Sequence, residues 1–108
     1  MRVAFGYFKK HFLMSDPEIA ARRRAIVDCA GANDCALVAI FIDELETAPE
    51  QLHKALRALM EADDVVLILP NLLHLAAAGN PLQLRQHLLA SHVEVLLSEV
   101  PKQAGRTC

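Results

Sequence analysis

The stretch DVVLILPNLLHL, residues 64–75, decides the fold class of this chain. Its run of aliphatic residues at 65–69 predicts a strand that is buried on both faces of a sheet. The strand leads directly into a loop, and in open α/β sheets the loops beyond the carboxyl ends of the strands hold the functional site. The polar side chains of this loop are Asn71 and His74, set among leucines and alanines. The stretch therefore says more about the fold than about the chemistry.

Three further apolar runs and three helical patterns surround this strand. The runs at residues 3–8, 35–42 and 93–97 are typical of strands, and the unbroken run at 35–42 predicts a strand covered on both faces. Each helical pattern begins at a capping signal: SDPE at 15–18, TAPE at 47–50 and NP at 80–81. Strands that alternate with helices across short connections predict an α/β three-layer sandwich, with a mainly parallel four-stranded sheet flanked by helices.

Length and composition indicate one compact domain. The chain has 108 residues, of which 54% are hydrophobic, and this is enough for a single core. We assign residues 1–100 to the domain and residues 101–108 to a flexible C-terminal tail. A net charge of −2 argues against stand-alone nucleic-acid binding. Because no run approaches the roughly 18 apolar residues of a membrane span, we expect no membrane contact and a cytoplasmic location.

Three segments follow the carboxyl ends of predicted strands and should meet at one edge of the sheet: KKH at 9–11, DELE at 43–46 and NLLH at 71–74. The first loop contains no glycine, so neither a dinucleotide-binding fingerprint nor a P-loop is present. A pocket repurposed for phosphate or a nucleotide would instead use four side chains. These candidate ligand-binding residues are Lys9, Lys10, His11 and His74.

The histidines, cysteines and clustered arginines form no recognisable motif. No two histidines have a short ligand spacing and there is no CxxC pair, so we assign no metal and no cofactor. We expect a buried thiol at Cys29 and at Cys35. Residues 22–24 are consecutive arginines that spread around a helix, so they cannot form one phosphate clamp. We expect them to face solvent; a weak contact with an acidic partner or nucleic acid is the alternative.

Three short motifs lie on the predicted strands: FGY at 5–7, IFID at 40–43 and ADDVVL at 62–67. Their order and spacing resemble the catalytic domain of serine recombinases, the resolvase and invertase family, over about residues 2–98. The resemblance implies a resolvase-like fold.

The resemblance also implies where catalytic residues would lie, and this chain departs from the family at those positions. The family's first strand ends Tyr-x-Arg-x-Ser, and its Ser attacks a DNA phosphate. Counted from Tyr7, the Arg position is Lys9 and the Ser position is His11. The family's Asp-Arg-x-x-Arg loop corresponds to residues 71–75, with leucine at both Arg positions, and residues 51–53 supply no substitute. Phosphoryl transfer needs preorganised positive charge, so we assign no catalytic residues and expect no recombinase activity.

The apolar loop after the third strand suggests how such a domain would act. This loop contains Leu72, Leu73 and Leu75. It either forms a turn packed on its own core or makes an interface with a partner. The simplest partner is a second copy of the chain, related by a two-fold axis. We therefore expect a catalytically inactive, serine-recombinase-like domain that acts as a protein-association module, as a homodimer and not as an enzyme.

Two alternatives stay open. The first is a phosphate or nucleotide binder, or a repurposed enzyme, that uses the four candidate ligand-binding residues. The second is a residual role in DNA recombination beside a DNA-binding partner. The family places a long dimerising helix and a helix-turn-helix domain after this region, and residues 1–108 hold neither. Any DNA binding is thus expected to be weak or indirect.

Overall fold

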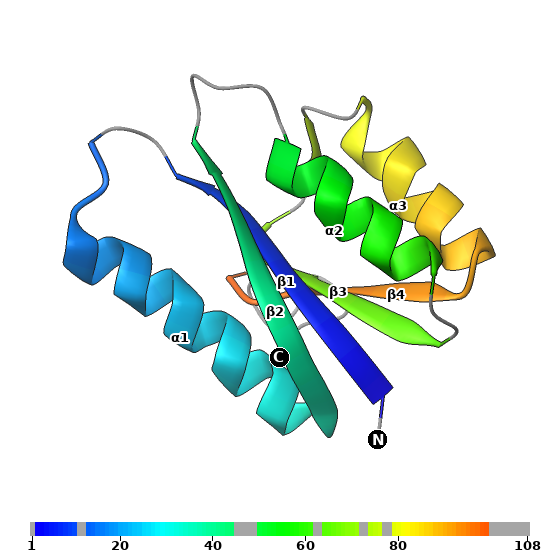
Figure 1. The fold of residues 1–108 in the computed structure, drawn as a ribbon, viewed down its shortest axis with the longest axis horizontal. Coiled ribbons are helices and arrows are strands. Elements are labelled where there is room, and N and C mark those ends of the chain that lie inside the picture. The colour runs from blue at the N-terminus through cyan, green and yellow to red at the C-terminus, as the bar shows by residue number, and fades with distance from the viewer. Residues whose placement is uncertain are drawn as a thin grey trace.

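The computed structural model describes residues 2–10, 13–44, 50–61, 64–71, 74–76 and 79–99. Strands and helices alternate along the chain (Figure 1). The elements are β1 (Arg2–Lys10), α1 (Asp16–Ala32), β2 (Cys35–Glu44), α2 (Glu50–Met60), β3 (Val65–Leu69), α3 (Pro81–Ala90) and β4 (Val93–Leu97). All seven predicted elements are present, and β3 and β4 have the predicted bounds.

The described strands form one sheet in the order β2-β1-β3-β4, and each neighbouring pair is parallel. Helix α1 covers one face of the sheet, while α2 and α3 cover the other (Figure 1). The predicted three-layer α/β architecture is confirmed, and this sheet is entirely rather than mainly parallel. Because the strands are parallel, their carboxyl ends lie along one edge, where β1, β2 and β3 bring their following segments together.

Two of the capping signals are seen in place. Ser15 is the N-cap of α1, where its Oγ accepts a hydrogen bond from the Glu18 amide at 3.3 Å and donates to Glu18 Oε1 at 3.2 Å. Asn80 caps α3 by accepting from the amides of Leu82 and Gln83. These side chains satisfy backbone N–H groups that have no partner within the helix. The predicted cap of α2 at residues 47–49 lies outside the described residues.

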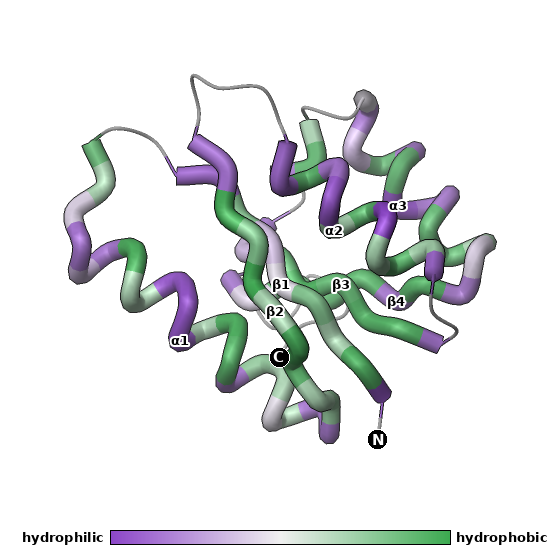
Figure 2. Tube along the Cα trace, in the orientation of Figure 1, coloured by the Kyte–Doolittle hydropathy of each residue, from purple (hydrophilic) through white to green (hydrophobic). Residues whose placement is uncertain are grey.

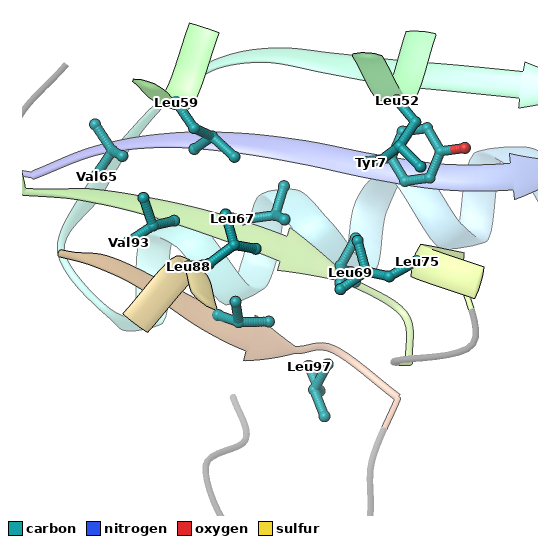
Figure 3. Packing of buried hydrophobic residues seen from close by; sticks show 11 residues of the cluster. Tyr7, Leu52, Leu59, Val65, Leu67, Leu69, Leu75, Leu88, Val93 and Leu97 are labelled. Carbon is teal, nitrogen blue, oxygen red and sulfur yellow. The ribbon is translucent and has the colours of Figure 1, made fainter. Parts of the chain in front are cut away.

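The core has two layers, one on each side of the sheet. All five residues of β3 are buried, as the run of aliphatic residues in this strand predicts. On the α2 and α3 side, Tyr7 and Leu52 pack with the inward side chains of β3 and β4 (Figure 3). On the α1 side, Ile26 packs against Phe8 and Val66. Cys29 and Cys35 are buried in this second layer as predicted. Cys35 is a free thiol, as expected, but Cys29 is disulfide-bonded, so the prediction of a thiol there is wrong.

Strand β2 packs against α1 on one face and against α2 on the other, as predicted, with Ile40 in the α1-side layer and Phe41 in the α2-side layer. It lies at the edge of the sheet and, among the described strands, pairs with β1 alone. A register shift opposite Ala4 and Phe5 leaves Val38 as an extra residue, with 61% of its surface exposed. Figure 2 shows the hydrophobic residues continuing along this edge strand. An unbroken apolar run identified the strand but not its place in the sheet.

The loop after β3 corrects part of the predicted interface. Residues 74–76 form a short 3₁₀ turn, and Leu75 is fully buried among the core side chains beneath α2 and α3 (Figure 3). A side chain buried in its own core cannot cover a partner, so the interface prediction is wrong at Leu75. Leu72, Leu73 and the predicted tail at 101–108 lie outside the described residues. No helix in the described ranges is long and apolar enough to cross a membrane.

Candidate functional site

Asp43 sits at the carboxyl end of β2, where three donors converge on its carboxylate. Tyr7 Oη and the Leu52 amide each donate to Oδ2 at 2.9 Å, and the Gln51 amide donates to Oδ1 at 2.9 Å. Only 4% of the Asp43 surface is exposed. The two amides belong to the first turn of α2, where free N–H groups and the helix dipole favour a negative charge. Asp43 therefore fastens the start of α2 to β1 and β2.

The Tyr7 hydroxyl is held in its neutral form by this contact. Burial raises the pKa of Tyr7 strongly, and the hydrogen bond to the Asp43 carboxylate together with its negative charge raises it further. A phenol that donates to a buried carboxylate is a poor nucleophile, because ionisation would place two negative charges side by side. The pair thus serves to hold the elements together.

His74 makes the second set of contacts at this edge. Its Nδ1 accepts a hydrogen bond from the Lys9 amide at 2.9 Å, so β1 and the turn after β3 are joined through the ring. Its Nε2 lies 3.1 Å from Arg22 Nη1 on α1. The side chain is buried, with 8% of its surface exposed. Burial, followed by the positive charges of Arg22 and Lys9, lowers the pKa of His74 to about 4, so the ring is neutral at pH 7.

Two cations near the edge are paired with carboxylates. Lys10 Nζ lies 3.4 Å from Glu44 Oε1, which links the ends of β1 and β2. Arg22 Nε lies 3.4 Å from Glu99 Oε2, in the segment that follows β4. All four side chains are partly exposed, so each pair contributes little to stability. The two carboxylates offset part of the positive charge that would attract a phosphate to this edge.

The structure brings some of the predicted ligand-binding residues together. Lys9 and His74 are in direct contact through the Lys9 amide, and Lys10 lies on the same strand end beside Glu44. His11 lies outside the described residues. Whether these residues bind a ligand stays a prediction.

Sequence reasoning missed Arg22, which it grouped with its exposed neighbours. Arg23 and Arg24 are exposed as predicted, but the Arg22 side chain is only 26% exposed and contacts His74. The signal was the helical spacing: Ile19, Arg22 and Ile26 follow one another at three and four residues. That spacing places Arg22 on the stripe of α1 that faces the sheet.

The described residues show no group of three His, Cys, Asp or Glu side chains arranged to hold a metal ion. The oxygens of Asp43 are occupied by the donors described above, and His53 is exposed on α2. The chemistry at this edge therefore consists of hydrogen bonds and ion pairs, with His74 as its buried imidazole.

Comparison with known proteins gives one informative likeness. No protein-family model and no curated protein sequence matches this chain. The crystal structure of a resolvase family site-specific recombinase from Streptococcus pneumoniae is similar, with a TM-score of 0.75. The alignment covers 92% of this chain and 73% of the recombinase at 16% sequence identity. This chain has a resolvase-like fold. At that identity the likeness establishes the fold alone.

Proposed function

We propose that this chain is a catalytically inactive resolvase-like domain that acts by associating with a second copy of itself. The observation that carries the proposal is that buried polar groups at the carboxyl edge of the sheet form hydrogen bonds within the fold. Asp43 holds the first turn of α2, and His74 holds the Lys9 amide. Asp43 and His74, the buried polar side chains of the described residues, are thus engaged in maintaining the fold.

The contacts of His74 argue against a role as general base. Its Nδ1 lone pair is directed at the Lys9 amide, and its Nε2 faces a guanidinium. A base must instead approach the proton of a nucleophile within hydrogen-bond distance. Ser15, the hydroxyl of the first loop, is exposed and exchanges hydrogen bonds with Glu18 as a helix cap. Neither group has the environment of an activated catalytic residue.

The free edge of β2 supports association. From Cys35 to Ile42 the strand carries no charged residue, and Val38 is 61% exposed. Edge strands of monomeric proteins usually carry lysine, proline or an inward-facing charge, since an unpaired apolar edge invites pairing with another strand. The bulge at Val38 interrupts the ladder but adds no charge. This surface is therefore better suited to a covered state than to water.

A second copy is the occupant that this edge fits. Antiparallel pairing of two β2 strands about a two-fold axis joins two sheets through one self-complementary contact. Because residues 35–42 are uncharged, the two strands meet without like-charge repulsion along this run. The proposed interface replaces the one expected at Leu75, which lies in the core.

Sedimentation equilibrium of the wild-type chain and two variants tests this proposal. Val38→Lys places a charge on the β2 edge, and we expect it to weaken dimerisation at least tenfold, equivalent to about 1.4 kcal/mol. Leu82→Lys is the matched control, because Leu82 has nearly the same exposure (62% against 61%) but lies on α3, which packs against β4 at the other edge of the sheet. A monomeric wild-type chain, or equal weakening by both variants, would refute the proposed association.

A further inference from the structure

The contacts of His74 leave two hydrogen-bond donors facing each other. A neutral imidazole has one N–H, and because Nδ1 accepts from the Lys9 amide, the proton resides on Nε2. That nitrogen lies 3.1 Å from Arg22 Nη1, which is always a donor. Two donors cannot satisfy one another, and an unsatisfied N–H on a side chain that is 8% exposed is costly. No residue in the described ranges accepts a hydrogen bond from both groups.

The surrounding charges favour an anion as that acceptor. Arg22 and Lys9 both exert positive electrostatic effects on His74. Glu99 offsets part of this charge through its Oε2, which lies 3.4 Å from Arg22 Nε. Two positive side chains against one negative side chain leave a net charge of +1. A charge-assisted hydrogen bond from Arg22 and a second bond from His74 would then hold one oxygen-bearing anion.

We propose that a small oxyanion binds between His74 Nε2–H and Arg22 Nη1–H, at the junction of α1 with the turn after β3. The low pKa of His74 keeps the ring neutral at pH 7, so it remains a single donor with a fixed tautomer. Phosphate and carboxylate groups share the chemistry that this pair of donors recognises, and binding requires no catalytic step. The site does not depend on the proposed self-association, which concerns the hydrogen-bonding edge of β2 and is read out by sedimentation.

Nuclear magnetic resonance of the histidine ring nitrogens, together with thermal unfolding, tests the site directly. In the wild-type chain without anion, we expect Nδ1 of His74 to be unprotonated and Nε2 to be protonated. Added sodium phosphate should shift the Nε2–H resonance and raise the unfolding temperature in a saturable manner, relative to sodium chloride of equal ionic strength. Sodium acetate in a parallel titration distinguishes a carboxylate from a phosphate as the preferred group.

Three variants separate this site from a general salt effect. Arg22→Gln should weaken phosphate binding by about tenfold or more, because it removes the charge-assisted bond. His74→Asn should also weaken it while leaving an amide oxygen near the Lys9 amide. Arg23→Gln is the matched control on the exposed side of the same helix and should bind as the wild type does.

Several outcomes would overturn the proposal. One is a His74 ring with the proton on Nδ1, since Nε2 would then accept directly from Arg22. Another is the absence of saturable stabilisation by either anion in the wild-type chain. An equal response in Arg22→Gln would mean that the salts act on the whole surface rather than at this pair of donors.

Discussion

At the scale of single residues, a few buried polar groups hold the carboxyl edge of the sheet together. Asp43 was part of a segment expected at this edge, and His74 was a candidate ligand-binding residue. The sequence placed both at this edge because Asp43 lies at the carboxyl end of one strand and His74 lies in the loop that follows another. Their partners were not predictable, since the Lys9 and Leu52 amides carry no side-chain signature. Arg22 was hidden in a run of three arginines, where only helical spacing separates the inward residue from its neighbours.

His74 should make stability depend on pH. Its pKa is about 4 in the folded chain against 6.5 for an ordinary histidine, so between these values the unfolded chain binds more protons. The free energy of unfolding should therefore fall as the pH drops from 6.5 to 4, by up to about 3 kcal/mol from this residue. Urea unfolding at pH 7 and pH 4.5 measures this loss.

The control for that experiment is a variant whose residue does not titrate. His74→Asn should lose less stability than the wild type between the two pH values, whereas His53→Gln, at an exposed position on α2, should behave as the wild type does. If the free energy of unfolding of His74→Asn has the same pH dependence as that of the wild type, His74 is not the group responsible.

Tyr7 should stabilise the fold through its hydroxyl as well as its ring. Tyr7→Phe keeps the ring in the core but removes the donor to Asp43 Oδ2, which retains the Leu52 amide. We expect a loss of about 1–2 kcal/mol, because a hydrogen bond to a buried charged group is removed. Chemical denaturation measures this loss, and an unchanged midpoint would show that the Tyr7–Asp43 contact contributes nothing.

At the scale of the elements, local sequence signals located helices and strands but did not order them in the sheet. Capping residues predicted the starts of α1 and α3, and the aliphatic run predicted all of β3. The same reasoning did not place β2 at the edge of the sheet, since the apolar pattern of a strand covered on both faces also occurs in an edge strand. Strand order depends on which crossovers form between distant segments, and no local pattern records that choice.

Helix α1 packs closely against β1 at Gly6, so an added methyl group there should lower stability. A Cβ at Gly6 would lie 2.7 Å from Ile26 Cγ2, so α1 or the Ile26 side chain must move. We expect Gly6→Ala to destabilise the chain by about 1–3 kcal/mol. Thermal unfolding with calorimetry measures the change.

Gly31 in the same helix provides the control. A Cβ there meets nothing within 4 Å, so Gly31→Ala should leave stability unchanged or raise it by about 0.5–1 kcal/mol through helix propensity. Similar effects of the two substitutions would contradict the close contact between α1 and β1.

At the scale of the whole molecule, a resolvase-like fold is retained at 16% identity to a known recombinase structure. The buried strands and capped helices account for this retention, because they specify the core without specifying a reaction. The function was harder to predict for the same reason. Leucine at positions where the resembled family has arginine favours the proposal of an inactive domain, but nothing in a sequence motif identifies the surface that a partner would cover.

The most direct measurement is amide hydrogen exchange of residues 35–42 as a function of protein concentration. We predict that amides on the free edge of β2 become protected as the concentration rises, and that Val38→Lys abolishes this protection while exchange in β3 is unchanged. Exchange in β2 that does not depend on concentration, in a chain whose β3 amides are fully protected, would contradict association through this edge.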